Sequence, residues 1–430
     1  MNKVVTSAGL FAIGAATVYG YDPEMTRAQS GRPFTVSATV RGFYDDNSTA
    51  SPDRQWVTTP SGTRAVDARQ ESFGFEVSPA VHVNLPLEQT FIRAGYVYSL
   101  RYYEGRQDDK IDQQHEFNAL LRHAFSARHD VALSDSFTYS SEPTVTDRFG
   151  IITAPVRTET TAMRNRAGID YNVALTQVLG LGLGYVNTWY DYDDSGVGSR
   201  SAILDRLEHL FRADLRYQFD PTLVALVGYQ FGLNSYTGDD FIVGTQESEI
   251  RDSYSHYLYV GVDHDFNHKL RGTVRVGGQF IDYHEIGESE VSPYLDAALT
   301  YVYLPESSVQ VGVRHMRNAT DIVAPDASGT PTLDQETTAA FVQVTHRITA
   351  KLKGNLFGQV QRSTFTAGAA DDDVESLYLV GLNFEYRINH HWAVELGYNY
   401  DLLESDVEQA GLDARSYDRN RVYVGVRASY

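Results

Sequence analysis

Apolar and polar residues alternate with a period of two along most of the chain from Phe34 onward. Clear examples are Leu270–Val276 and Tyr378–Ile388, in which every second residue is apolar or glycine. This period is that of a β-strand with one apolar and one polar face, whereas an amphipathic helix repeats every 3.6 residues. No stretch shows a convincing helical period, so the pattern predicts an all-β protein.

The alternating stretches form eighteen predicted strands, most of them about 12–16 residues long. Strands in soluble β-sandwiches usually have about 5–6 residues, whereas tilted strands that cross a bilayer need about 9–11 and can protrude beyond it. The lengths therefore favour a membrane barrel over a soluble sandwich or propeller. The predicted strands centre on residues 34–45, 70–84, 90–103, 114–126, 130–140, 160–175, 177–192, 203–219, 222–236, 251–266, 269–285, 291–304, 307–318, 335–348, 351–365, 374–388, 391–404 and 416–430.

Short and long connections alternate between these strands. Short ones are 85–89, 127–129, 219–222, 266–269, 305–307, 349–351 and 389–391, and long ones include 47–68, 141–159, 237–250, 319–334 and 405–415. Such alternation is typical of outer-membrane barrels, with turns in the periplasm and loops outside. We therefore predict a closed antiparallel transmembrane β-barrel of about 18 strands, with both termini on the periplasmic side. Protease added to intact cells should cut loop 319–334 and spare turn 389–391.

The N-terminus has the features of a targeting segment. A short positive start, Met1–Lys3, precedes the apolar stretch Val4–Tyr19, and small residues follow near Gly20. This order is typical of a secretory signal peptide, and the apolar stretch is too short to favour the alternative of a membrane anchor helix. We predict a signal peptide at 1–20, a periplasmic segment at 21–33 and the barrel at 34–430.

Composition narrows the class further. Acidic residues number 56 against 36 basic ones, which gives a formal net charge of −20 and argues against a nucleic-acid partner. The absence of any internal apolar run of about 18 residues excludes a bundle of transmembrane helices. Cysteine is absent, which suits an oxidising compartment. Five of the basic residues are lysine and the others arginine, which forms planar, bidentate ion pairs better than lysine does.

A glycine followed by an aromatic residue recurs after the short turns. Examples are Gly95-Tyr96, Gly184-Tyr185, Gly228-Tyr229 and Gly397-Tyr398. In each pair the glycine falls on the strand face opposite the tyrosine. We interpret the repeat as a device in which an aromatic ring covers a glycine of the neighbouring strand and fixes the pairing register.

The last predicted strand carries the most specific signal. Its alternate residues Val422, Val424 and Val426 share one face, and Tyr430 is the terminal residue. An alternating strand that ends in an aromatic residue resembles the assembly signal of outer-membrane barrel proteins. We assign that role to these four residues, the alternative being a chance edge strand.

A family resemblance rests on this tail. The segment Tyr417–Tyr430, the repeated Gly-Tyr strands and turns such as Phe219–Thr222 resemble the putative β-barrel porin 2 family. The resemblance implies an outer-membrane, porin-like barrel, often considered a companion of exopolysaccharide export. It supplies no catalytic residues that could be transferred to this chain.

The two faces of the predicted strands separate apolar from charged residues. Phe211, Leu215 and Tyr217 lie on one face of their strand, and the residues between them lie on the other. Arginine or lysine on the lipid side at bilayer depth costs roughly 2–4 kcal/mol, so the charged face must line the lumen. Alternatively, the charges brace the wall in ion pairs or are covered by a plug. The predicted pore-lining residues are Arg93, Arg122, Arg166, Asp170, Arg212, Asp214, Arg216, Arg271, Arg275, Arg347, Glu385, Arg387, Glu395, Arg421 and Arg427.

Metal and cofactor sites find little support. His123, His264 and His346 lie near predicted short turns, where we interpret histidine as a substitute for an interfacial tyrosine rather than as a metal ligand. The acidic segments Asp191–Gly196 and Asp371–Asp373 lack the twelve-residue calcium-loop pattern. We predict no metal and no cofactor, although binding of divalent cations to these loops stays open.

A serine–histidine set, an outward carboxylate and an apolar loop also stand out in the sequence. Ser134 and Ser136 share a polar face and His115 lies on the preceding strand, but nothing in this spacing singles out a catalytic triad. Asp135 falls on the outward face, which suggests a β-bulge. The apolar loop Phe149–Val156 either constricts the lumen, contacts a neighbouring protomer or packs locally.

The sequence thus predicts a non-enzymatic outer-membrane channel for small polar or charged solutes. Its expected partners are outer-membrane lipids, the barrel-assembly machinery and the solutes, and a homo-oligomer is left open. The alternatives are a conduit for exopolysaccharide export, a structural or surface-interaction barrel with its lumen blocked by loops, and a barrel hydrolase. The sequence does not identify the solute or the gating.

Overall fold

The computed structural model describes residues 33–52, 55–59, 62–66, 69–107, 109–141, 145–146, 152–154, 161–409, 412–413 and 415–430. The predicted signal peptide and the predicted periplasmic segment up to residue 32 lie outside these residues. Among the described residues, no helix is long and apolar enough to cross a membrane.

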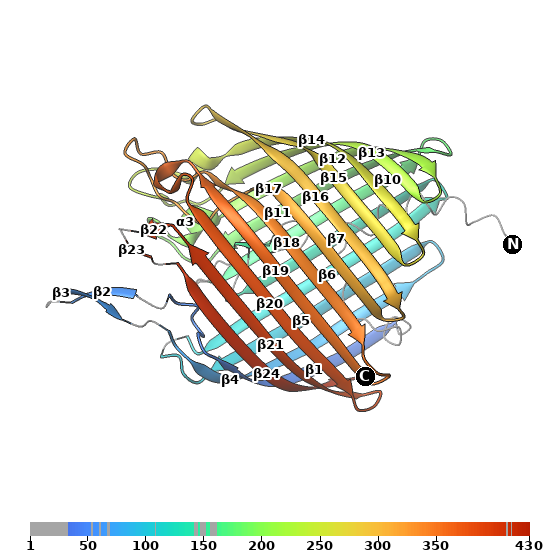
Figure 1. Ribbon diagram of the computed structural model, residues 1–430, viewed down its shortest axis with the longest axis horizontal. Coiled ribbons are helices and arrows are strands. Elements are labelled where there is room, and N and C mark those ends of the chain that lie inside the picture. Colours follow the sequence, from blue (N-terminus) through green and yellow to red (C-terminus); the bar gives the residue numbers. More distant parts are fainter. Residues whose placement is uncertain are drawn as a thin grey trace.

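Eighteen antiparallel strands form one closed sheet, as predicted (Figure 1). The strands are β1 (Phe34–Asp45), β4 (Ser72–Pro86), β5 (Thr90–Tyr103), β6 (Ile111–Ser126), β7 (His129–Ser140), β10 (Ala162–Ala174), β11 (Leu179–Tyr192), β12 (Arg206–Asp220), β13 (Leu223–Tyr236), β14 (Ser253–Asn267), β15 (Leu270–Tyr283), β16 (Glu288–Leu304), β17 (Ser307–Asn318), β18 (Asp334–Arg347), β19 (Leu352–Thr366), β20 (Val374–Arg387), β21 (Trp392–Ser405) and β24 (Tyr417–Ser429). The largest boundary differences are about three residues, as at β6, which was predicted from 114.

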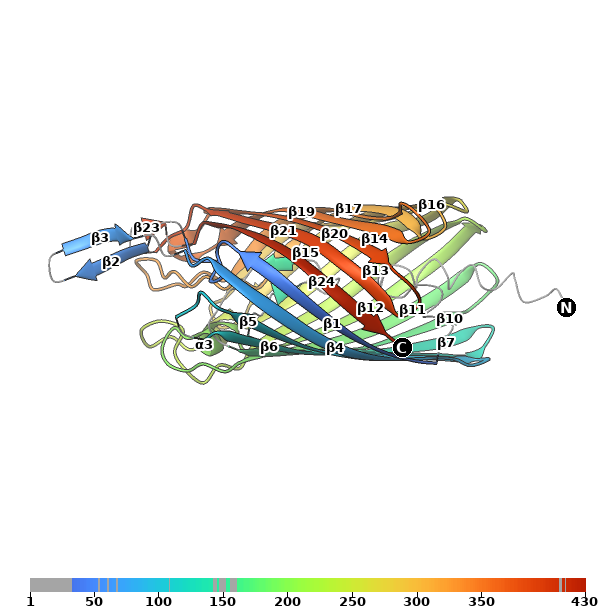
Figure 2. The same cartoon turned by 90° about the horizontal axis from the view of Figure 1, so that it is seen from below.

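Strands β1 and β24 close the barrel. Their pairing runs from Ser37 opposite Ser429 to Asp45 opposite Arg421. The terminal Tyr430 continues this ladder, because its backbone N and O both bond to Val36, at 2.8 and 3.1 Å. The C-terminus lies at the short-turn end, opposite the loop end that carries the hairpin β2 (Gln55–Thr59)–β3 (Gly62–Val66) and the helix α3 (Arg200–Leu204) (Figure 2).

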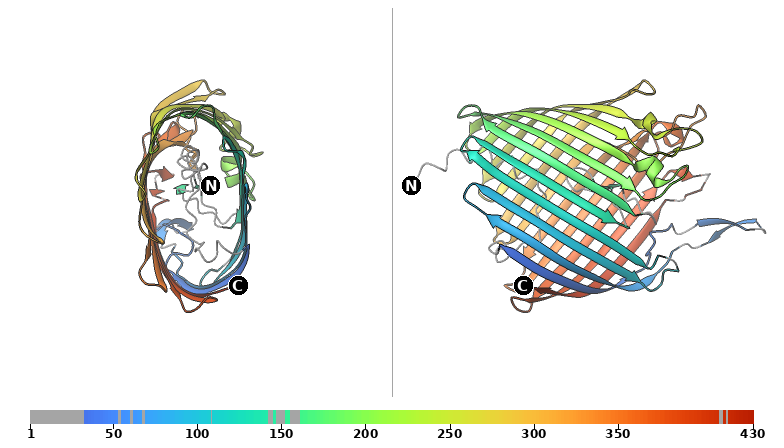
Figure 3. Two further views of the ribbon diagram at one scale, coloured as in Figure 1. Left: turned by 90° about the vertical axis from the view of Figure 1, so that its right-hand side faces the viewer. Right: turned by 180° about the vertical axis from the view of Figure 1, so that it is seen from behind.

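The barrel is oval rather than round in cross-section (Figure 3, left). One narrow end of the oval is formed around β14, β15 and β16, and the other around β1, β4 and β24. The oval shape therefore places two tightly curved parts of the inner wall at opposite ends.

Apolar side chains are exposed and polar side chains are buried along the strands, which is the reverse of the pattern in a soluble protein. Phe211 and Leu215 on β12 are 48% and 47% exposed, whereas Asp214 between them is 8% exposed. The same alternation holds on neighbouring strands, with apolar side chains outward and polar side chains inward. An apolar outer wall and a polar interior are the pattern of a barrel that is surrounded by lipid.

Tyrosine rings cover two of the four glycines named in the repeat, Gly228 and Gly397, but these rings are not the tyrosines that follow glycine in the repeat. Tyr259 pairs with Gly228 and Tyr423 with Gly397. At both glycines an added Cβ would overlap the tyrosine ring. The missing side chain therefore makes room for a ring that belongs to the next strand.

The predicted bulge at Asp135 is wrong. Asp135 pairs in regular register with Ala119 on β6 and Ala167 on β10. Its carboxylate accepts a hydrogen bond from Asn165 Nδ2 at 3.1 Å. A polar partner on the next strand thus accommodates the outward carboxylate, and no shift in register is needed.

The loop end also carries short elements. They are β8 (Val145–Thr146), β9 (Ile152–Ala154), η1 (Ser248–Arg251), η2 (Gly368–Ala370), β22 (Glu408–Gln409) and β23 (Leu412–Asp413). Of the apolar loop Phe149–Val156, only β9 is described, and it pairs with β8. The constriction predicted for that loop lies otherwise outside the described residues.

Candidate functional site: the inner wall and the loop end

Each predicted pore-lining residue lies on the strand face opposite the exposed apolar side chains. Most of them take part in ion pairs with neighbours on the same face. The pairs form two groups, one along β10 to β17 and one where β1, β4, β5, β21 and β24 meet.

In the first group, Asp263 on β14 is the most enclosed charge. Its two carboxylate oxygens form ion pairs with Arg216 at 2.7 Å and with Arg275 at 2.6 Å. The Asp263 side chain is fully buried. Because a buried carboxylate requires charged or hydrogen-bonding partners, these arginines act as struts of the wall as well as charges facing the interior.

The Arg271 side chain is more accessible to solvent than that of Arg275. It pairs with Asp265 at 2.5 Å, and the two side chains are 32% and 27% exposed. Arg347, near the turns, pairs with Glu306 at 3.1 Å, and these two side chains are 39% and 34% exposed. The inner wall therefore contains both enclosed and solvent-accessible charges.

Several ion pairs and hydrogen bonds cross an intervening glycine. Arg212 on β12 reaches Asp170 on β10 at 2.5 Å over Gly184, which pairs with both residues. A Cβ on Gly184 would lie about 3 Å from each of these side chains. The inward glycines thus let a side chain on one strand bond to the strand two positions away.

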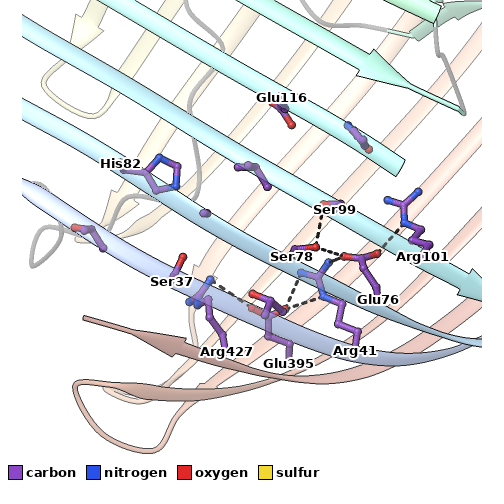
Figure 4. A pocket seen from close by; sticks show the side chains of 15 residues that line it. Ser37, Arg41, Glu76, Ser78, His82, Ser99, Arg101, Glu116, Glu395 and Arg427 are labelled. Atoms are coloured by element: carbon purple, nitrogen blue, oxygen red, sulfur yellow. Dashed lines mark hydrogen bonds and ion pairs between the residues drawn. The ribbon is translucent and has the colours of Figure 1, made fainter. Parts of the chain in front are cut away.

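The second group lies at the narrow end of the oval that is formed around β1, β4 and β24 (Figure 3, left), and its side chains are shown in Figure 4. Arg41 on β1 bonds to Glu76 on β4 and to Glu395 on β21, both at 2.8 Å. Arg101 adds a second bond to Glu76 at 2.8 Å, and Arg427 lies 3.4 Å from Glu395. The Arg41–Glu395 pair crosses Gly425 of β24, because Gly425 pairs with both residues.

These residues surround a cavity of about 220 Å³. Hydroxyl side chains complete its wall, and Ser78 bonds to Ser99 at 2.9 Å and to Glu76 at 3.0 Å. Ser37, His82 and Glu116 also face the cavity (Figure 4). Polar groups of both signs and hydroxyls are the lining expected where hydrated solutes touch a wall.

The seam between the first and last strands holds a further cluster. Asp45 on β1 accepts bonds from Arg419 at 2.6 Å and from Arg421 at 2.9 Å. Its side chain is fully buried. Thus the predicted residue Arg421 stabilises the closure of the barrel, whereas Arg427 pairs with Glu385 and Glu395 on the β20–β21 side of β24.

At the loop end, the loop 319–333 contacts several other loops, and we call it the bridging loop. Asp321 accepts a bidentate pair from Arg415, at 3.0 and 3.1 Å, and a third bond from Arg200 at 3.3 Å. Burial alone would raise the pKa of Asp321, but Arg415 and Arg200 outweigh it and hold the pKa below its usual value. The bridging loop therefore joins the β11–β12 and β21–β24 connections.

Apolar contacts reinforce this arrangement. Ile322 packs with Phe365, Ala370 and Val407, and Val323 packs against the cluster that contains α3. The β19–β20 connection also bonds to the bridging loop, from Ala369 N to Ala324 O at 2.7 Å. The bridging loop thus ties the β11–β12, β19–β20 and β21–β24 connections into one network.

Only part of the loop 319–334 is exposed enough for the predicted protease cleavage. Thr320 and Thr332 are 1% and 0% exposed, and Asp321, Ile322 and Leu333 are also buried. Exposed positions are confined to Pro325–Ser328 at the tip. The length and polarity of the segment predict a loop. That most of the loop is buried could not be predicted, because its contacts are with residues far away in the sequence.

The histidines near the turns have neighbours that fit the interfacial interpretation. His123 bonds to Thr90 Oγ1 at 2.8 Å, His346 to the Tyr303 hydroxyl at 2.7 Å, and His264 lies 3.2 Å from a backbone carbonyl. In the described part of the chain, no group of three or more His, Cys, Asp or Glu side chains could hold a metal ion. The region has the geometry of an interfacial aromatic belt.

The serine–histidine alternative finds no geometric support in the described residues. His115 bonds to the hydroxyl of Tyr96, which is 41% exposed on the outer face. Ser134 and Ser136 alternate with the exposed Leu133 and therefore lie on the inner face. A nucleophile and its base must be within hydrogen-bonding reach of each other, and the wall separates these groups.

Comparison with known proteins gives one family and several barrels. The sequence model of the family described as putative beta-barrel porin 2 matches residues 34–430. Similar solved structures include the ferric enterobactin receptor PfeA of Pseudomonas aeruginosa, as a mutant, with 10% identity, 93% of this chain and 81% of that chain covered, and a TM-score of 0.45. OccAB4 of Acinetobacter baumannii has 11% identity, coverage of 95% and 100%, and a TM-score of 0.42. OpdQ of Pseudomonas aeruginosa has 12% identity, coverage of 92% and 98%, and a TM-score of 0.39. The comparison with curated proteins returned no match.

Proposed function

Because the chain belongs to the putative β-barrel porin 2 family, we propose that it is an outer-membrane channel that passes small polar or charged solutes. The observation that carries this proposal is the distribution of charge in the wall. Residues of both signs occupy the inner face while the outer face is apolar. An 18-stranded barrel is wider than its own side chains can fill, so the inner charges border an aqueous path.

Charges of both signs on one wall give a channel a transverse field. Such a field orients polar solutes and does not exclude one sign of ion outright. The solvent-accessible pair Arg271–Asp265 and the cavity of Figure 4 are the parts of the wall that a passing solute would meet. The predicted signal peptide would deliver the chain to the outer membrane.

Conductance in planar bilayers tests the proposal, with Arg271→Gln and Asp265→Asn as a matched pair. Each variant removes one charge from the same partly exposed ion pair. We expect single-channel steps for the unmodified chain, a reversal potential shifted towards cation selectivity for Arg271→Gln, and the opposite shift for Asp265→Asn. Absence of steps, or reversal potentials that neither variant changes, would contradict the proposal.

A second candidate, a barrel whose lumen is closed by its loops, is favoured by the bridging loop. That loop is held by Arg415, Arg200 and the α3 cluster. Under this reading the wild-type chain gives no conductance, and Arg415→Met, which releases the loop, opens a path. The exopolysaccharide conduit implied by the family resemblance gains no specific support from the described residues.

A further inference from the structure

A second cavity lies on the inner wall at the loop end, and we call it the loop-side cavity. It has a volume of about 160 Å³ and is lined by residues of β10 to β15, of η1, of the end of β17, of the start of β18 and of the bridging loop. The pairing of β16 with β17 ends at Leu295 opposite His315. Beyond that point the Arg317 backbone N donates to Gln279 Oε1 at 2.9 Å, which places the end of β17 against the inner face of β15.

The cavity has a local excess of positive charge in an acidic protein. Its lining contains four arginines and two carboxylates, a formal sum of +2; these are Arg166, Arg206, Arg251, Arg317, Glu208 and Asp334. Arg206 pairs with Glu208 at 2.8 Å and Arg317 with Asp334 at 2.8 Å. Arg317 also pairs with Glu290 at 3.3 Å, so the positive charge that bears on the cavity lies at Arg251.

Arg251 is a buried cation that contacts neutral groups. Its side chain donates to the carbonyls of Ile203 at 3.0 Å and Thr320 at 2.5 Å and lies over the ring of Tyr236 at 4.6 Å. Arg251 is 0% exposed, and among the described residues no carboxylate pairs with it. Buried charges are normally paired, so an anion in the adjoining cavity would supply a missing counter-charge.

Buried polar atoms on the lining that lack a hydrogen-bond partner within the described structure include the donors Arg317 Nε and Asn318 Nδ2 and the acceptor Asn234 Oδ1. The Arg317 side chain is 6% exposed, with its other nitrogens bonded to Asp334, Thr366 and Glu290. Because an unsatisfied buried polar atom is costly, these atoms call for a ligand or water that offers both acceptors and donors.

The remaining lining gives the cavity its size and shape. Tyr236, Tyr257 and Tyr283 line it together with the apolar side chains of Met316 and Leu333. At roughly 10–15 Å³ of such space per water molecule, the cavity has room for about ten or more waters. A solute of that size has about ten to fifteen non-hydrogen atoms.

We propose that the loop-side cavity binds a small hydroxylated carboxylate. Its carboxylate would meet the buried cation Arg251, and its hydroxyls would satisfy Asn234 and Asn318. This inference deepens the proposed function, on which it rests, by naming the class of solute that the channel holds.

Isothermal titration of the full barrel in detergent tests the site with three matched probes. Gluconate carries both a carboxylate and hydroxyls, glucitol carries only the hydroxyls, and hexanoate carries only the carboxylate. We expect gluconate to bind most tightly. Equal affinity for glucitol and gluconate, or no gluconate binding, would overturn the proposal.

Variants locate the binding. Asn234→Leu and Asn318→Leu should each weaken gluconate binding by about three- to tenfold, the loss expected for one uncharged hydrogen bond. Ser99→Ala, in the cavity of Figure 4, should leave it unchanged. A heat-modifiable gel band would verify that each variant is folded, and folded Asn variants that bind gluconate normally would overturn the assignment.

Conductance separates this inference from the proposed function. If the barrel conducts but does not bind gluconate, the channel function is supported and the binding site is contradicted. If the barrel binds gluconate through Asn234 and Asn318 but never conducts, the binding site is supported and the channel function is contradicted.

Discussion

Replacing Arg275 by glutamine should cost much more stability than the same change at Arg271. Arg275 shares the fully buried Asp263 with Arg216, and its side chain is 15% exposed. Loss of one charge-assisted hydrogen bond costs about 1.5–3 kcal/mol, and removing one partner from a buried ion pair costs about 3–5 kcal/mol. Since Arg216 stays in place at 2.7 Å, we expect about 2–3 kcal/mol for Arg275→Gln.

The matched change at Arg271 removes a pair that water already reaches. Its side chain and that of Asp265 are 32% and 27% exposed, and such pairs contribute about 0–1 kcal/mol. The two variants should therefore differ by about 2 kcal/mol, which is roughly a thirtyfold difference in the unfolding equilibrium. Both changes remove one positive charge, so net charge does not explain the difference.

The assay is guanidinium unfolding of the refolded barrel in detergent, followed by the fraction of heat-modifiable band. The midpoint and slope give the free energy of unfolding for each variant. Asp263→Asn provides an internal check, because it leaves Arg216 and Arg275 without their carboxylate and should cost at least as much as Arg275→Gln. If the two arginine variants agree within about 0.5 kcal/mol, then Asp263 is hydrated and the strut interpretation fails.

Three further predictions concern the packing, the C-terminus and the loop end. Gly228→Ala should lower the yield of folded barrel because its Cβ would overlap the Tyr259 ring, whereas Gly278→Ala, with its nearest neighbour at 4.0 Å, should be tolerated; equal yields would contradict the covering role. Deleting Tyr430 should slow assembly in vitro and in cells because two backbone bonds of the closing ladder are lost, and unchanged assembly would remove the signal role. Burial raises the pKa of Asp205, beside α3, from 3.8 to about 6, so the folded loop end binds a proton that the unfolded chain releases. The stability of α3 should therefore fall by up to about 3 kcal/mol as pH rises from about 4 to about 6 and stay level above, as measured by hydrogen exchange, and Asp205→Asn should flatten this profile.

The strands could be predicted from the sequence because lipid and lumen impose a period of two on every span. Strand ends were placed well where a turn residue interrupts the alternation, as at Asp220–Thr222, where the Asp220 side chain bonds to Thr222 N at 2.7 Å. Arg41 was missed as a charged wall residue although its alternation with Thr39 would have placed it on the inner face.

The loop-end contacts could not be predicted in the same way. Arg415 and Asp321 are 94 residues apart, and neither lies in a periodic stretch. Which carboxylate meets which guanidinium there depends on how separate loops pack, and no local pattern encodes that. Arg251 likewise resembles an ordinary loop arginine in the sequence, and its isolation from carboxylates emerges only from the three-dimensional arrangement.

The Arg41–Glu395 pair has a consequence for how the barrel completes itself. The two residues are separated by 354 positions and meet across Gly425 when β24 docks against β1. Until that docking, Arg41 and Glu395 each keep one partner on their own edge, Glu76 and Arg427, but lack the pair that joins the two edges. The ion pair therefore favours the correct register of β1 against β24, since a slipped register would separate the guanidinium from its carboxylate. The same ion pair can also form between two chains, because β1 of a second chain presents the same arginine to β24. Such pairing would give a strand-exchanged oligomer instead of a closed monomer.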